Sequence, residues 1–377
     1  MYKLCIAGKN NIAVEILEYS LNFFKANEIC VIPNQTDSGK NTWQKSLIFY
    51  SKLLNIDIVS LEDIYNIPEL IFLSLEFNKI INPNLFTSKK LFNIHFSLLP
   101  KYKGMYTSLF PILNGDEYSG VTIHCIDQGI DTGDIIDQVK FKLQNYTSRE
   151  LYSKYMMEGI KLIKRNFVAL IENKFYPIKQ KFCNSTYYSI HSFDFNSLEI
   201  DLHKTAFQID CFVRGMNFRE YQQATYKNIP IRKIEILETK SLKKPGSLIN
   251  ENEFSYTVST IDFDIKLYTD SYSNLLLACC HDDMELARTI IMNIENIDEP
   301  DSTGRTPLII ACCNGASNLV DLLIQQGADV NKPDTNGRSP IMYAKEYADR
   351  NGKFGIIHQL IKNGANLTQK DISRKSQ

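Results

Sequence analysis

Two nearby stretches decide the fold: NIHFSLLPKYKG at residues 93–104 and GVTIHCIDQGIDTGDI at residues 120–135. The first continues a run, LFNIHF at residues 91–96, in which apolar and polar side chains alternate. Alternation with a period of two is typical of a strand, because successive side chains point to opposite faces. We therefore expect Asn93 and His95 to share one face of a strand.

The second stretch predicts another strand followed by a tight turn. Residues 121–126 are rich in β-forming side chains, and Asp131 follows between Gly129 and Gly133. Pro100 interrupts the chain between the two strands, which predicts a turn there. An amide, an imidazole and a carboxylate on strand ends and a glycine-flanked loop form a site suited to acyl or one-carbon transfer.

Taken singly, each of the three residues has an ordinary structural explanation. Asn93 could end a strand, His95 could be a partly buried histidine with satisfied hydrogen bonds, and Asp131 could be a turn residue. Taken together, Asn and His followed by Ser-Leu-Leu-Pro and then Asp-x-Gly-x-Asp-x-Gly resemble the folate-dependent formyltransferase superfamily. The resemblance extends over roughly residues 1–240 and implies that Asn93, His95 and Asp131 are the catalytic residues.

Length and composition are those of a multidomain globular protein. The 377 residues (43.4 kDa) can hold two to three domains, and 44% hydrophobic side chains can supply their cores. The net charge is −1, and no dense basic run occurs. This balance argues against a nucleic-acid partner.

Cysteine usage and hydropathy indicate a reducing compartment. The nine cysteines include no C-x-x-C pair, and no Cys/His set has zinc spacing, so we expect no metal site. The amino-terminal residues lack a signal-peptide pattern, and no apolar run approaches the length of a membrane span. We expect a cytoplasmic protein without membrane contact.

Short apolar runs alternate with helical periodicity in the first part of the chain. Runs at residues 3–8, 29–32, 56–59 and 70–75 read as strands, the first of them buried, and residues 43–54 as a helix. This pattern predicts an α/β fold with a Rossmann-like, mostly parallel sheet, in which ligands gather at the carboxyl ends of the strands. No G-x-G-x-x-G follows the first strand, so the sheet need not bind NAD.

Further elements complete two predicted domains. We expect a helix capped by Thr147 and a second helix over residues 197–216. Residues 229–237 and 256–268 are β-rich. The predicted boundaries are residues 1–215 for a catalytic domain and residues 216–270 for a small antiparallel β element that completes the acceptor site.

The remainder, residues 273–377, repeats with a period of 33. Ala278, Ala311 and Ala344 keep that spacing, and Thr306-Pro307 returns as Ser339-Pro340. Period and motif resemble those of ankyrin repeats, about three of them, with helix pairs that begin at the proline and end at a glycine. The array predicts dimer contacts or packing, or alternatively a surface for a protein or small-molecule ligand on loop tips 301–305 and 334–338.

The expected chemistry is attack of a neutral amine on a formyl carbon. His95 is the natural base, since its reference pKa of about 6.5 lies near working pH. Asn93 can donate to the developing oxyanion, which is commonly worth about 3 kcal/mol. Asp131 can bind the far side of His95 and orient it.

The family resemblance also implies the ligand-binding residues. The co-substrate would be 10-formyltetrahydrofolate, and no metal is needed. The residues that this resemblance assigns to the folate are Phe77, Lys79, Ile80, Ile81, His124, Asp127 and Gly129. Those that it assigns to a nucleotide-linked sugar are Lys9, Met105, Tyr106, Arg214, Phe218 and Tyr221.

Among the acceptors of this superfamily, bacterial dTDP-linked amino-dideoxyhexoses fit best, because ankyrin modules occur with those enzymes. The resemblance implies a 3-amino-3,6-dideoxy sugar used for surface polysaccharide (O-antigen), and a homodimer. Two alternatives keep the fold: a methionyl-tRNA or other amine formyltransferase, and a formyltetrahydrofolate hydrolase. A third is not an enzyme: an ankyrin scaffold on an inactive sheet domain.

Overall fold

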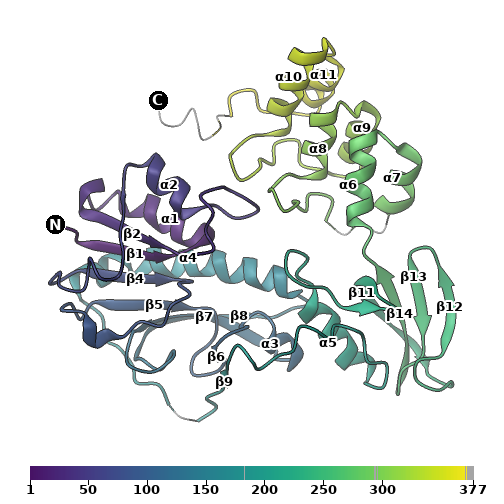
Figure 1. The fold of residues 1–377 in the computed structure, drawn as a ribbon. Helices are drawn as coiled ribbons and strands as arrows, with labels where there is room; N and C mark the ends of the chain where they lie inside the picture. The colour runs from purple at the N-terminus through teal and green to yellow at the C-terminus, as the bar shows by residue number, and fades with distance from the viewer. Residues whose placement is uncertain (182, 293, 295, 370, 372–377) are drawn as a thin grey trace. The chain divides into compact units, whose positions relative to one another are not determined.

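The computed structural model describes residues 1–181, 183–292, 294, 296–369 and 371. It divides into two units (Figure 1). The first contains Met1–Gly39 and Ser46–Thr269; the second contains Lys40–Lys45 and the chain from Asp270 onward. None of the helices in the described residues is long and apolar enough to cross a membrane.

A seven-stranded sheet organises the first unit, in the order β3-β2-β1-β4-β5-β7-β8. The strands from β3 to β5 are parallel to their neighbours, and β7 and β8 continue the sheet in antiparallel fashion. The predicted Rossmann-like sheet is thereby confirmed. The strands are β1 (Leu4–Gly8), β2 (Ile29–Pro33), β3 (Asp57–Ile58), β4 (Ile71–Leu75), β5 (Leu91–His95), β7 (Tyr118–Cys125) and β8 (Ile135–Lys142).

Two helices of this unit, α1 (Asn10–Ser20) and α4 (Ser148–Glu172), pack against each other beside the sheet (Figure 1). Helix α4 begins as predicted, with a capping box between Thr147 and Glu150. A Cβ at Gly159 of α4 would lie 3.0–3.7 Å from side chains of α1 and β5, so the helix packs closely at this glycine.

Two helices are shorter than the sequence predicted. Helix α2 spans Leu47–Leu53 and starts at the Ser46 cap, so Trp43 lies outside it. Helix α5 spans Ala206–Met216 rather than residues 197–216, because the Thr205 side chain accepts from the Gln208 N–H and caps the helix there. The remaining short elements are η1 (Ala26–Glu28), η2 (Pro83–Leu85), β6 (Lys103–Gly104), α3 (Phe110–Leu113) and β9 (Tyr187–Tyr188).

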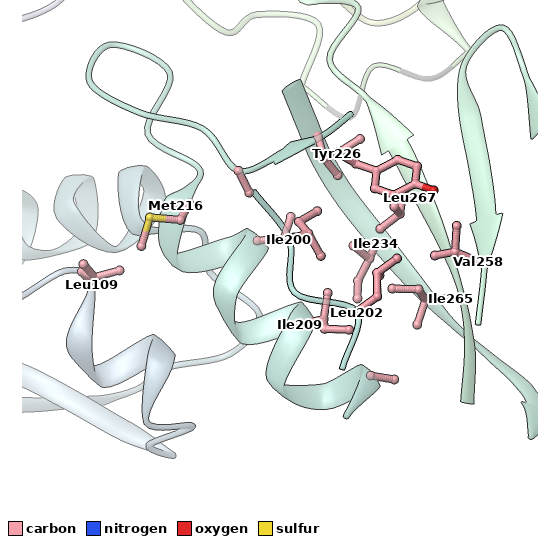
Figure 2. Packing of buried hydrophobic residues seen from close by; sticks show 14 residues of the cluster. Leu109, Ile200, Leu202, Ile209, Met216, Tyr226, Ile234, Val258, Ile265 and Leu267 are labelled. Carbon is pink, nitrogen blue, oxygen red and sulfur yellow. The ribbon is translucent and has the colours of Figure 1, made fainter. Parts of the chain in front are cut away.

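A second, five-stranded sheet follows α5 in the same unit, with order β10-β11-β14-β13-β12 and antiparallel pairing. Helix α5 packs on it through buried side chains that include Ile209, and the sheet contributes Ile234 and Leu267 (Figure 2). The strands are β10 (Thr225–Tyr226), β11 (Ile229–Lys240), β12 (Leu248–Asn252), β13 (Ser255–Val258) and β14 (Phe263–Thr269).

The second unit contains three helix pairs, as the repeats predicted. They are α6 (Tyr272–His281) with α7 (Met284–Ile291), α8 (Pro307–Asn314) with α9 (Ser317–Gln325), and α10 (Pro340–Asn351) with α11 (Gly355–Lys362). Pro307 and Pro340 occupy first-turn positions, and Gly327 follows α9 with a positive φ of 89°. Helix α10 has 12 residues where α8 has eight, which accounts for the extra residues near 349–353.

The six residues Lys40–Lys45 belong to this second unit although they follow β2 in the chain. The Trp43 N–H donates to the Ser302 carbonyl at 3.2 Å, and Asn41 Nδ2 donates to Asn336 Oδ1 at 3.0 Å. Both acceptors lie on the loop tips for which the sequence predicted a binding role. The chain's own segment 40–45 therefore contacts these tips.

Candidate active site

Strands β5 and β7 and the turn after β7 bring the predicted trio together. Asn93 and His95 lie on β5, two residues apart, and Asn93 pairs across the sheet with His124 of β7. Asp131 lies between β7 and β8 with a positive φ of 53°, which turns the chain back toward β5. Asn93 and His95 both face the Asp131 carboxylate, so they share one face of the strand, as the alternation in sequence predicted.

Both oxygens of Asp131 face nitrogen atoms. Oδ1 accepts from Asn93 Nδ2 at 3.2 Å and lies 3.4 Å from His124 Nε2. Oδ2 accepts from the Gly104 N–H at 2.9 Å and lies 3.4 Å from His95 Nδ1. The Asp131 side chain is only 11% exposed, so nearly all its hydrogen-bonding capacity is directed into this cluster.

The surroundings of Asp131 favour its ionised form. Burial raises the pKa of this carboxyl, but the charge of His95, the hydrogen bond and charge of His124, and the Gly104 N–H together outweigh burial. The net effect holds the pKa of Asp131 well below its usual range. The site therefore keeps a fixed negative charge beside two imidazole rings.

The second nitrogen of His95 faces the main chain. His95 Nε2 lies 2.7 Å from the carbonyl oxygen of Tyr102, a residue with a positive φ of 59°. A carbonyl only accepts, so this contact is made by an Nε2–H. Nε2 can receive a proton only in the other neutral tautomer, in which the ring proton lies on Nδ1 toward Asp131 Oδ2 and the Tyr102 carbonyl no longer faces Nε2.

The loop that carries Asp131 is held by a residue that sequence reasoning missed. Gln180 Nε2 donates to the carbonyls of Asp131 (2.9 Å) and Gly133 (2.8 Å). No local sequence pattern around Gln180 predicts this role, because its contacts with Asp131 and Gly133 join positions almost 50 residues apart. At Gly133 a Cβ would lie 1.8 Å from the Cys125 carbonyl oxygen, so only glycine fits the turn.

The residues predicted to bind folate fall into two groups. His124 is 2% exposed and bonds Asn93, so its side chain lies within the trio, and Asp127 accepts from Gly129 N–H and Thr132 Oγ1 and shapes the turn. On the segment after β4, Phe77 and Ile81 are partly buried against the core. Lys79 is exposed, and Ile80 is 77% exposed.

The residues predicted to bind the sugar nucleotide are also divided. Met105 and Tyr221 are exposed, and Lys9 is half-buried. Phe218 is buried, and Tyr106 packs on the α5 core and donates to the Ile190 carbonyl. The Arg214 guanidinium bonds Asp210 at 2.7 Å and the Tyr146 carbonyl at 3.2 Å. Arg214 is thus engaged within the protein.

A second polar cluster, formed by Asn10, Glu76 and Tyr152, was also missed. Asn10 follows β1, Glu76 follows β4 and Tyr152 lies on α4. Their side chains hydrogen-bond one another. In the sequence, the acidic residue directly after the apolar run 70–75 could have indicated this cluster. In the described residues, no three His, Cys, Asp or Glu side chains are arranged to hold a metal ion.

Comparison with known proteins bears on this arrangement. Residues 57–166 match the family described as formyl transferase, and residues 275–371 match ankyrin repeats. A solved structure of WlaRD, a sugar 3N-formyl transferase, in the presence of dTDP and 5-N-formyl-THF is 44% identical, with a TM-score of 0.66. The alignment covers 71% of this chain and 98% of that one.

The N-formyltransferase from Helicobacter canadensis, solved with folinic acid and dTDP-3-aminofucose, is also 44% identical, with a TM-score of 0.67 and coverage of 72% and 100%. Curated relatives include methionyl-tRNA formyltransferases. That of Clostridium beijerinckii is 36% identical over 44% of this chain, but the chain spans only 54% of its length. That of Clostridioides difficile is 29% identical over 69% of this chain and 89% of its own.

Proposed function

The chain belongs to the formyltransferase family, and from that premise we propose that it moves a formyl group from 10-formyltetrahydrofolate to the amino group of a dTDP-linked amino-dideoxyhexose. A 3-amino-3,6-dideoxy sugar is the favoured acceptor. The observation that carries the proposal is the cluster in which the Asp131 carboxylate contacts Asn93 and His95 at the carboxyl end of β5.

The chain's own residues account for the proton and charge changes of such a transfer. Asn93 is assigned the donation of an amide N–H to the formyl oxygen, where negative charge develops during attack; in the protein alone its Nδ2 contacts Asp131 Oδ1 and His124 Nε2. His95 takes the proton that the amine loses as its nitrogen bonds to the formyl carbon, and the imidazolium then gives that proton to the tetrahydrofolate nitrogen whose bond to the formyl carbon breaks. Asp131 lies 3.4 Å from His95 Nδ1, where its charge stabilises that imidazolium.

The loops after β4, β6 and β7 carry exposed apolar side chains that suit the ring faces of the co-substrate. Ile80, Met105 and Ile130 are exposed apolar side chains on the loops after β4, β6 and β7, and Met105 and Ile130 adjoin Gly104 and Asp131 in the chain. Tetrahydrofolate supplies the activated formyl group when bound, and we propose that the segment from Phe77 to Ile81 forms one wall of its pocket. Single exposed apolar residues are common, but their coincidence on loops next to the trio supports a binding surface.

The choice of a sugar acceptor rests on two observations. The identity to two sugar N-formyltransferase structures is 44% over nearly their whole length, against 29% to a methionyl-tRNA enzyme over 89% of its length. The net charge of −1 and the absence of basic runs in the sequence also disfavour a tRNA ligand, which is gripped through phosphates. Methionyl-tRNA stays the second candidate because the curated relatives carry that name.

We further propose that the product serves surface polysaccharide synthesis in the cytoplasm, and that the chain acts as a homodimer. The test supplies the protein with 10-formyltetrahydrofolate and, separately, dTDP-3-amino sugar, dTDP-4-amino sugar and methionyl-tRNA. Product mass identifies the acceptor. Formylated 3-amino sugar is the expected product, whereas formylated methionyl-tRNA alone, or formate released without any acceptor product, contradicts the proposal.

A matched pair of histidine variants separates chemistry from folding. His95→Ala should abolish transfer, while His203→Ala should not. His203 also has its Nδ1 3.4 Å from an aspartate oxygen, that of Asp201, but its side chain is 77% exposed. Equal turnover in the two variants would remove His95 from the mechanism.

A further inference from the structure

Glu76 is the residue directly after β4, and the proposed chemistry does not use its carboxylate. Its Oε2 accepts from Tyr152 Oη at 2.7 Å and from Asn10 Nδ2 at 3.2 Å. Asn10 Nδ2 also donates to Tyr152 Oη at 2.6 Å, which closes a three-membered network. The network joins the end of β1, the end of β4 and the first turns of α4.

The backbone of this network is held in an uncommon conformation. Glu76 and Asn10 have positive φ angles of 60° and 63°, a region that costs free energy for residues other than glycine. Asn34 supports the turn at Glu76: its Nδ2 donates to the Glu76 carbonyl at 2.9 Å, and its Oδ1 accepts from the Asn78 N–H at 3.2 Å. Such conformations cluster at binding sites, where the surrounding structure determines them.

The electrostatic setting of Glu76 is unfavourable in the protein alone. Burial raises the pKa of the Glu76 carboxyl, and this exceeds the opposing influence of Lys9, Tyr152 and Asn10. Both donors to Oε2 are neutral groups. In the part of the chain that the structure describes, Oε1 accepts no hydrogen bond. A carboxylate oxygen in this position can accept a hydrogen bond from a ligand.

The position of Glu76 places it beside the candidate chemistry. Strand β4 lies between β1 and β5, so the residue after β4 lies between Lys9–Asn10 and the strand end that carries His95. The Tyr152 hydroxyl donates to Glu76, and the centroid of its ring lies 6.0 Å from that of Phe96, the residue after His95. The same ring packs at 5.5 Å from Phe218, one of the predicted acceptor residues.

We propose that Glu76 is a specificity-determining residue for the acceptor, and that its Oε1 accepts a hydrogen bond from a hydroxyl of the amino sugar. This rests on the proposed function. A hydroxyl is a better partner than the reacting nitrogen, because a carboxylate bound to that nitrogen would favour the ammonium form, which cannot attack. Asn10 holds the Glu76 side chain in place, and Glu76 holds the sugar through its hydroxyl. The amine of the sugar then points toward His95.

The test compares two acceptors on the full-length protein: a dTDP-3-amino sugar that has a hydroxyl next to the amine, and the same sugar lacking that hydroxyl. Wild type should prefer the hydroxylated sugar by about 10- to 100-fold in kcat/KM, as expected for a hydrogen bond to a buried charge. Glu76→Gln should lose most of this preference by raising KM for the hydroxylated sugar. The KM for 10-formyltetrahydrofolate should not change.

Two further variants keep the result interpretable. Tyr152→Phe removes one donor to Glu76 but keeps the carboxylate, so it should retain the preference. Glu76→Asp keeps the charge but withdraws the oxygen by one methylene, so it should lose preference even if Glu76→Gln folds poorly. Thermal unfolding of every variant provides the control for folding.

The outcomes separate this proposal from the proposed function. A wild type that formylates none of the amino sugars overturns both. An active wild type whose preference for the hydroxylated sugar survives in Glu76→Gln and Glu76→Asp overturns only the role of Glu76. Equal losses on both acceptors, in Glu76→Gln and Tyr152→Phe alike, would show that the network merely supports the fold.

Discussion

Replacing Asp131 by asparagine should lower both the stability of the protein and its turnover, although the two side chains have nearly the same shape. The side chain keeps its shape, but an amide has one accepting oxygen where the carboxylate has two. If that oxygen keeps the Gly104 N–H, the new NH₂ faces Asn93 Nδ2. If Asn93 flips to relieve the contact, its Nδ2 gives up the contacts that it makes with residue 131 and with His124 Nε2.

The mismatch thus moves within the cluster but does not disappear. Its cost is at least one charge-assisted hydrogen bond, about 1.5–3 kcal/mol of unfolding free energy. Loss of the charge beside His95 should lower kcat by about 100-fold or more, because the imidazolium formed during transfer is no longer stabilised. Denaturant unfolding measures the first effect, and turnover with saturating acceptor measures the second.

Asp127→Asn is the matched control. Asp127 lies in the same loop, but the Gly129 N–H and Thr132 Oγ1 both donate to its single oxygen Oδ1. An asparagine oxygen can replace that oxygen, so this variant should stay within about 0.5 kcal/mol of wild type. Equal destabilisation by the two substitutions would refute the argument from the two oxygens of Asp131.

The pH dependence of stability provides an independent check. The pKa of Asp131 is depressed in the folded chain, so its ionised form stabilises the fold at every pH above the unfolded value of about 3.9. That contribution is lost as pH falls through the folded-state pKa. The stability difference between wild type and Asp131→Asn should therefore shrink as pH falls below about 4. A difference that grows as pH falls below about 4 would have the wrong sign.

Three other outcomes are expected. Gly104→Ala should destabilise the protein by about 2 kcal/mol or more in denaturant unfolding, since the residue has a φ of 85° and a Cβ would lie 2.2 Å from the Tyr188 carbonyl oxygen; an unchanged midpoint would contradict this. His95→Ala should lower turnover by about 100-fold or more in steady-state assays while the variant still unfolds cooperatively, with a thermal midpoint below that of His203→Ala because the His95 ring is buried. Arg305→Ala should stay within about 0.5 kcal/mol of wild type and leave kinetics alone; altered acceptor affinity would instead point to a ligand on the ankyrin tips.

Local patterns predicted the elements whose signals are contained in a short window. Alternation predicted β5, the Thr147–Glu150 pair predicted the start of α4, and the 33-residue period predicted the helix pairs of the second unit. The errors occurred where a capping side chain competed with hydrophobic periodicity. Ser46 and Thr205 start α2 and α5 later than the apolar pattern suggested, because a cap ends the extended segment before the helix.

The sequence predicted the motif residues of the candidate site but not the side chains that pair with them. The motif identified Asn93, His95 and Asp131, and the structure brings them together; their catalytic roles stay predictions. The internal pairing of Arg214 with Asp210 did not follow from the motif, since an arginine at a helix end is equally compatible with a ligand contact.

The sequence by itself determined the class of sheet and the repeat array, because strand alternation and repeat period are properties of neighbouring residues, and the resemblance of its motif to the formyltransferase superfamily suggested the trio. Only the tertiary structure decided which groups surround the trio. Gln180 reaches Asp131, and Tyr152 reaches Glu76, across separations of 49 and 76 residues. Such contacts depend on the order of strands in the sheet and on how α4 packs beside it, and no short window of sequence encodes either.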